Sequence, residues 1–123
     1  MAAILIVHFG ISMIHGTAHT GAHVPLSPAA NILVFTVIIT GGLIGMVLTW
    51  PAPRVGAVVV ALTLIGSLAF GFVNHFVLPS PDHISQVDMQ RRPLFGTTAV
   101  LLVITEALGI GPAVRPLRVR RIR

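Results

Sequence analysis

The sequence predicts an all-α integral membrane protein, an up-down-up-down bundle of four helices with both termini in the cytoplasm. Composition indicates the class, because 54% of the 123 residues are hydrophobic and only 9% are charged. These values, with a mean hydropathy of +0.95, lie well outside the range of soluble globular domains. Four apolar stretches separated by proline-rich turns predict the number of helices.

Each apolar stretch reaches the length of about 20 residues that is needed to cross a hydrocarbon core of about 30 Å. Prolines stand in every gap between the stretches, where they end one helix or begin the next. The gaps are so short that consecutive helices must be antiparallel neighbours. We therefore expect a single transmembrane domain over residues 1–123, with helices at about 2–22, 30–50, 55–78 and 94–114 and a basic tail at 115–123.

The arginines in the short flanks predict the orientation of the helices. Arg54 and the five arginines of the tail lie on one side of the membrane, against Arg91 and Arg92 on the other. The positive-inside rule therefore places both termini in the cytoplasm. The expected location is a bacterial-type inner (cytoplasmic) membrane, crossed by all four helices. Because most of the formal charge of +5 comes from the tail, we expect the tail to contact the lipid bilayer and not nucleic acid.

The chain contains neither lysine nor cysteine. Without lysine, Schiff-base chemistry and a retinal linkage are excluded. Without cysteine, thiolate catalysis, disulfides and iron–sulfur sites are excluded, which leaves histidine, carboxylate and thioether as metal ligands. The sequence also lacks a nucleophile beside a base, a Walker loop and a dinucleotide fingerprint. No catalytic residue is therefore assigned.

A polar stripe runs down the first predicted helix. His8, Ser12, His15, His19 and His23 recur every three or four residues and lie within an arc of about 80°. Polar groups without partners are costly in hydrocarbon, so this stripe cannot face lipid. We expect it to face the interior of the bundle or a cavity.

The third predicted helix offers partners to this stripe near its outer end. Counting at about 1.5 Å per residue places His75 and His19 at the same depth. The outward connection that follows carries Asp82 and His83. We therefore predict a cofactor site at His15, His19 and His75, with Asp82, His83 and His23 as further metal ligands.

Two kinds of centre fit these residues. Neutral imidazole is a good ligand for a transition-metal ion such as Fe, Cu or Zn, and two histidines four residues apart on a helix can bind the same ion. Haem b would instead take one axial histidine from each of the two helices. For either centre we expect a role in redox chemistry or electron transfer. So short a chain has no room for its own electron-donor domain, which predicts a homo-oligomer or a subunit of a larger membrane complex.

A second polar pair is expected nearer the cytoplasmic side. Glu106 is the only acidic residue within a predicted helix, and His8 lies at a similar depth. A hydrogen bond between them would lower the cost of burying either. Together with the stripe, the pair outlines a ladder of groups that titrate near neutral pH, as a small proton-coupled transporter would need. A third hypothesis is a structural or pigment-binding subunit whose histidines join helices or ligate a pigment.

Overall fold

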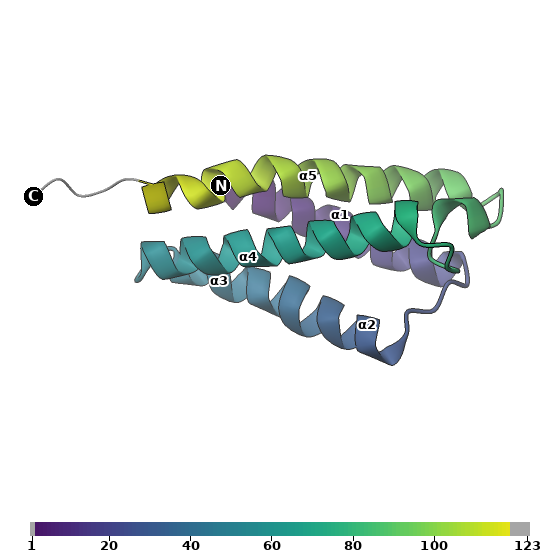
Figure 1. The fold of residues 1–123 in the computed structure, drawn as a ribbon, viewed down its shortest axis with the longest axis horizontal. Helices are drawn as coiled ribbons and strands as arrows, with labels where there is room; N and C mark the ends of the chain where they lie inside the picture. The colour runs from purple at the N-terminus through teal and green to yellow at the C-terminus, as the bar shows by residue number, and fades with distance from the viewer. Residues whose placement is uncertain (1, 119–123) are drawn as a thin grey trace, which may run out of the picture.

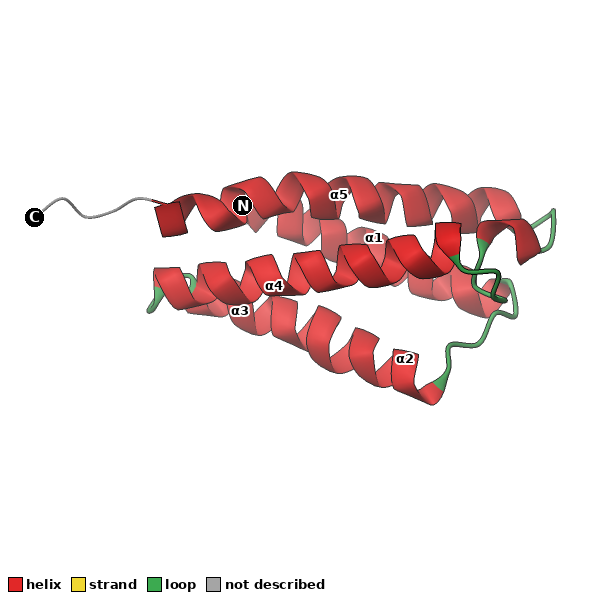
Figure 2. Ribbon diagram, viewed as in Figure 1, coloured by secondary structure: helices red, strands yellow, loops and turns green. Residues whose placement is uncertain are grey.

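The computed structural model of the chain describes residues 2–118, so Arg120, Arg121 and Arg123 of the predicted tail lie outside the described residues. Every element within residues 2–118 is helical, and none is a strand (Figure 2). The segments η1 and η2 are π-helical and η3 is a single 3-10 turn. In chain order the elements are α1 (Ala2–Gly21), α2 (Pro28–Ile32), η1 (Leu33–Gly41), α3 (Gly42–Leu48), α4 (Pro53–Phe72), η2 (Val73–Val77), η3 (Ile84–Gln86) and α5 (Arg92–Arg118).

These elements join into four continuous helices, each long and apolar enough to cross a membrane. They contain 20, 21, 25 and 26 residues, and a span needs about 20. The prediction of an all-helical chain with four potential membrane spans is confirmed, and it supports a multi-pass membrane protein. The four helices are α1, the union of α2, η1 and α3 (Pro28–Leu48), the union of α4 and η2 (Pro53–Val77), and α5 (Arg92–Leu117 of it).

The first connection reverses the chain at His23, whose backbone lies in the left-handed region with φ of 54°. This turn ends α1 and directs Val24 back along the helix, where its N–H donates to the His19 carbonyl at 3.1 Å. Ser27 then caps α2, because its hydroxyl accepts a hydrogen bond from the N–H of Ala30 at 3.2 Å. The loop therefore has defined backbone positions close to the histidines of α1.

The last helix extends beyond the end that the sequence predicts. Helix α5 continues to Arg118, whereas the apolar pattern ends near residue 114. Pro112 and Pro116 both lie inside α5. A proline removes its own N–H and crowds the preceding turn, but a helix in a membrane tolerates it where other groups satisfy the freed carbonyls.

Helix α5 packs along both α1 and α4, and α3 packs against α4. Figure 1 shows α1 beginning and α5 ending toward one end of the molecule, which also holds the turn at 49–52; we call this the terminal end. The connections at 22–27 and 78–91 lie at the opposite end, which we call the loop end. Toward the loop end the second span leans away from α4, so α2 stands apart from the other helices (Figure 1).

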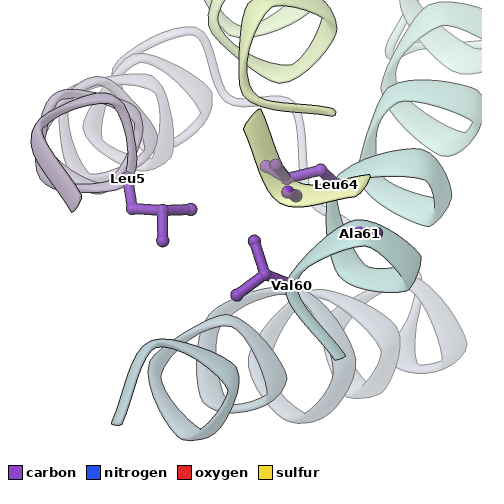
Figure 3. Packing of buried hydrophobic residues seen from close by; sticks show 5 residues of the cluster. Leu5, Val60, Ala61 and Leu64 are labelled. Carbon is purple, nitrogen blue, oxygen red and sulfur yellow. The ribbon is translucent and has the colours of Figure 1, made fainter. Parts of the chain in front are cut away.

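Two clusters of buried apolar side chains join the helices, and polar side chains are buried along the same inward faces. The cluster at the terminal end consists of Leu5, Val60, Ala61, Leu64 and Ala113, from α1, α4 and α5 (Figure 3). The cluster near the loop end consists of Ala18, Val24, Val87 and Phe95. The buried polar residues include His8, His15, His19, Ser67, His75, Thr98 and Glu106.

The hairpin of α3 and α4 depends on close contact between backbones. A Cβ atom on Gly45 would lie 2.9 Å from the backbone nitrogen of Val60. A Cβ atom on Gly56 would overlap the backbone of Leu48 and Thr49. Glycine lets helix backbones approach in this way, as in other membrane proteins. These two positions therefore set how closely the second and third spans pack.

Candidate metal centre

Three buried histidines from two helices form one cluster, which we call the histidine centre. His15 and His19 lie one turn apart on α1, and His75 comes from η2. One ring nitrogen of each lies within 4.8 Å of those of the other two. Nε2 of His15 and Nε2 of His75 are only 3.1 Å apart. The structure thus brings together the three residues that the sequence predicts as the core of a cofactor site.

The local backbone explains how His75 reaches the other two. His75 lies in the π-helical segment η2, which ends α4 with a wider turn than an α-helix. Such segments are rare and occur frequently at functional sites. The side chain is only 6% exposed. The wide turn is therefore part of the geometry that points the imidazole into the bundle.

The Nδ1 atom of each histidine is held by an oxygen outside the cluster. His75 Nδ1 donates to the carbonyl of Asp82 at 2.9 Å, and His19 Nδ1 donates to the carbonyl of Val24 at 3.2 Å. His15 Nδ1 donates to the hydroxyl of Thr98 at 2.8 Å. A carbonyl oxygen can only accept, so the hydrogen of His19 and of His75 is on Nδ1.

The hydroxyl of Thr98 also acts as an acceptor toward His15. Its own hydrogen is directed to the carbonyls of Leu94 and Phe95 in the preceding turn, at 2.8 and 3.0 Å. The hydrogen of His15 is then on Nδ1 as well. When the three imidazoles are neutral and keep these partners, each Nε2 carries a free lone pair, which is the form in which histidine binds a metal. Oxygen partners on the second ring nitrogen are the usual surroundings of metal-bound histidine.

Asp82 adds a carboxylate to the histidine centre. Its Oδ1 lies 3.4 Å from Nε2 of His19 and 3.7 Å from Nδ1 of His75. This oxygen is buried and has no hydrogen-bond partner among the described residues. A buried carboxylate oxygen without a donor is rare in proteins, because leaving it unpaired is costly. Oδ1 of Asp82 is therefore a buried acceptor without a donor beside His19 and His75.

The distance between the Nε2 atoms of His15 and His75 is close to that between two ligands of one metal ion. Metal–nitrogen bonds of about 2.0 to 2.1 Å in a tetrahedral site separate two ligand atoms by about 3.3 Å. The 3.1 Å between Nε2 of His15 and of His75 is close to this value. Two axial nitrogens of a haem stand on opposite faces of the ring, about 4 Å apart. The haem alternative from the sequence therefore does not fit this pair.

Phe95 forms an apolar wall against all three imidazoles. It is fully buried, and its ring centroid lies 5.0, 4.8 and 5.3 Å from those of His15, His19 and His75. An apolar wall excludes water and lowers the local dielectric, which strengthens the attraction between a cation and its ligands. Sequence reasoning missed Phe95, although it lies on the same helical face as Thr98 and Glu106.

Arg92 holds the connection that carries Asp82. Its Nε and one terminal nitrogen donate to the carbonyl of Val87 at 3.1 and 3.0 Å. The same terminal nitrogen donates to the carbonyl of Ser85 at 3.0 Å. These bonds tie the loop to the first turn of α5, so the position of Asp82 depends in part on a cation outside the cluster.

The cluster of three does not include His23 or His83, which the sequence predicts as further ligands. His83 is turned to its own loop, where its Nδ1 accepts from the N–H of Ser85 at 3.2 Å. His23 occupies the left-handed turn after α1 and lines a cavity beside the histidine centre. Both residues lie outside the regular helices, so turn geometry and not the helix period positions their side chains.

Glu106 and His8 are both buried, but each has a different partner from the one expected. Glu106 accepts a hydrogen bond from the hydroxyl of Ser67 on α4. His8 Nδ1 lies 3.4 Å from the hydroxyl of Thr105. Within residues 2–118 no hydrogen bond joins His8 to Glu106. Depth in the membrane gives the position of a residue along its helix. It does not specify which way the side chain points around the helix axis, so similar depths did not predict these partners.

A cavity of about 740 Å³ connects the histidine centre with Glu106. Residues of all four helices line it, including His15, Ser67 and Phe35. Its volume falls in the range of small-molecule sites, about 300 to 1,000 Å³. Comparison of the chain with known family models, with curated proteins and with solved structures gave no match.

The Thr98→Val variant tests the outer hydrogen bonds of the centre. Valine has nearly the shape of threonine but no hydroxyl, so His15 Nδ1 loses its acceptor and the ring loses its fixed orientation. We expect the affinity for a divalent metal to fall about 10- to 100-fold. Competition with a chromophoric chelator measures this change. The matched control is Thr97→Val, because Thr97 is exposed; equal affinities of the two variants would contradict the role of Thr98.

Proposed function

We propose that the protein binds one divalent transition-metal ion at the histidine centre, within its membrane-spanning helices near the loop end. The observation that carries this proposal is the convergence of acceptors. One ring nitrogen of each of the three histidines lies within 4.8 Å of those of the other two, and the unpaired Oδ1 of Asp82 lies 3.4 Å from Nε2 of His19, while every Nδ1 faces an oxygen outside the cluster. A cation satisfies all four atoms at once.

The ligand set limits the identity of the ion. Neutral imidazole suits Zn, Fe and Cu, whereas Mg and Ca prefer oxygen ligands. Three neutral imidazoles and one carboxylate leave a divalent ion with a single net positive charge. The redox or electron-transfer role predicted from the sequence requires Fe or Cu in this centre, while Zn would supply only a Lewis acid.

A metal-free alternative is a hydrogen-bonded contact between α1 and η2. In that case His15 would carry its hydrogen on Nε2 and donate to Nε2 of His75 across the 3.1 Å gap. Thr98 would then have to give up its bonds to the helix carbonyls and donate to His15. In this arrangement Oδ1 of Asp82 is paired only when His19 is protonated and its Nε2 donates across the 3.4 Å gap, whereas a metal ion would pair with the carboxylate while His19 stays neutral.

Our proposal for the membrane topology is an up-down-up-down bundle in a bacterial-type inner membrane, with both termini in the cytoplasm. The terminal end holds the start of α1, the end of α5 and the first turn of α4, which contains Arg54. The positive-inside rule assigns that end to the cytoplasm. The histidine centre then lies toward the extracytoplasmic side. A homo-oligomer or a larger membrane complex remains part of this proposal.

A proton or ion path across the membrane is less well supported. Beyond Glu106, toward the terminal end, the interior contains the apolar cluster of Leu5, Val60, Ala61, Leu64 and Ala113. All five side chains are at most 5% exposed. A tightly packed apolar layer carries no titratable group, so the polar ladder predicted from the sequence ends at Glu106 and His8.

Metal analysis of the purified chain tests the proposal directly. The protein is purified in mild detergent without chelators, offered Zn, Fe(II) and Cu in separate samples, desalted, and analysed by plasma mass spectrometry and absorption. We expect about one ion per chain for at least one metal and no Soret band. A metal content near zero with all three metals would refute the proposal, and a stoichiometric Soret band would replace the ion by haem.

A further inference from the structure

The cavity beside the histidine centre opens sideways, between α1 and η1. Met13 of α1 and Phe35 of η1 both line it, yet these side chains are 53% and 59% exposed. They therefore stand at its mouth. The second span, which carries Phe35, leans away from the other helices toward the loop end (Figure 1). In a membrane-spanning chain, this opening faces lipid.

The side chains around this opening determine which kind of molecule can enter the cavity. Its residues on η1 are apolar, with Val34 and Ile38 beside Phe35. Thr17, Thr20, His23 and Asn31 also line the cavity, but the η1 side offers a hydrated ion or sugar no replacement for its water. A molecule dissolved in the bilayer has no shell of bound water to lose when it enters the cavity. The cavity is therefore suited to a membrane-soluble ligand with a mainly apolar body.

Two polar positions lie inside this apolar cavity. One is the histidine centre at the loop end, and the other is Glu106 with Ser67. Ser67 precedes His75 by eight residues, which is about 12 Å along a helix. Glu106 is 2% exposed and has no cationic partner among the described residues. A ligand that satisfies both positions needs one oxygen for the metal and one hydroxyl that donates to the carboxylate.

We infer that the cavity binds a quinol, an apolar ring with a hydroxyl on each of two opposite edges and an apolar tail. One hydroxyl oxygen approaches the ion at the histidine centre, and the other hydroxyl donates toward Glu106. The tail leaves through the mouth between Met13 and Phe35 into the bilayer. This inference rests on the proposed metal ion, because without it the three Nε2 atoms would offer the ligand no positive charge.

Two glycines of α1 provide a test of whether the ligand binds in the cavity. Gly16 lines the cavity, and a Cβ atom on it would meet no atom within 4 Å. Gly10 lies two turns earlier on α1 and has equally open surroundings, but it does not line the cavity. Gly16→Leu therefore places a larger side chain at the cavity with open space at its Cβ, and Gly10→Leu adds the same side chain to the same helix elsewhere. Val34→Trp fills the cavity from η1, with Val37→Trp as its exposed control.

The experiment measures the binding of decylubiquinol to the metal-loaded chain in lipid nanodiscs, by calorimetry against empty nanodiscs. We expect saturable binding that Gly16→Leu and Val34→Trp weaken at least about tenfold, while both controls stay within about twofold of the unmodified chain. The dimethyl ether of the same quinol should bind weakly, because it has no hydroxyl to donate to Glu106.

Metal content measured on the same samples distinguishes failure of the quinol site from failure of the metal centre. Full metal content without saturable quinol binding would overturn the quinol site and leave the metal centre intact. Equal binding by Gly16→Leu and Gly10→Leu, or by quinol and ether, would also overturn it. An unmodified chain without metal would instead refute the proposed function on which the quinol site rests.

Discussion

Replacing His75 with alanine is expected to abolish stoichiometric metal binding. His75 is the one member of the histidine centre that does not belong to α1, and its Nε2 stands 3.1 Å from that of His15. Its loss removes one ligand and breaks the link between α1 and η2. Loss of a partner that only orients a ligand costs about 10- to 100-fold in affinity, so loss of the ligand itself should cost more than about 100-fold.

The matched control for His75→Ala is His83→Ala. His83 belongs to the connection that follows η2, yet its Nδ1 accepts from the N–H of Ser85 in its own loop. We expect this variant to retain about one ion per chain, as judged by plasma mass spectrometry after desalting. Circular dichroism checks that both variants keep their helices. Retention of metal by His75→Ala, or its loss from His83→Ala, would show that the ligands are not those of the histidine centre.

The second large effect is expected at Gly56, where the change of a single atom should destabilise the hairpin of α3 and α4. An alanine Cβ at this position would overlap the backbone of Leu48 and Thr49. Backbone cannot move aside as a flexible side chain can, so the helices must separate. We expect Gly56→Ala to lower the free energy of unfolding by at least about 2 kcal/mol, despite the better helix propensity of alanine.

Gly66 provides the control for this variant. It lies in the same helix α4, and a Cβ atom there would meet nothing within 4 Å. Gly66→Ala should therefore leave stability unchanged or raise it by up to about 1 kcal/mol. Unfolding by SDS in mixed micelles, followed by circular dichroism, measures both variants. If the two proved equally stable, the close approach at Gly56 would not be what holds this hairpin.

The sequence and the structure agree best on features that depend only on position along the chain or along a helix axis. Hydropathy and proline placement predict where apolar helices lie, and the structure has four helices of the required length. The period of the polar stripe predicts that His15 and His19 face inward, and both are buried. Counting residues from the helix ends predicts that His75 reaches their level, and the three meet.

The disagreements arise where rotation about a helix axis or the path of a loop decides. Depth alone paired His8 with Glu106, but the packing of α5 between α1 and α4 turns Glu106 to Ser67 instead. The π-helical segments η1 and η2 change the rotation of the side chains that follow them, and no periodicity in the sequence signalled them. The loop histidine His83 likewise follows a local turn.

The sequence by itself determined that this protein is helical and that four stretches are apolar enough to cross a membrane. It also determined which face of the first helix must be buried, because polar groups exposed to hydrocarbon are costly. It also named the three histidines of the centre. Only the tertiary structure decided what surrounds them. It placed Nδ1 of His15, His19 and His75 against oxygens from α5 and from two loops. These contacts join residues far apart in the chain, and they leave the other ring nitrogen of each histidine available for the proposed metal ion.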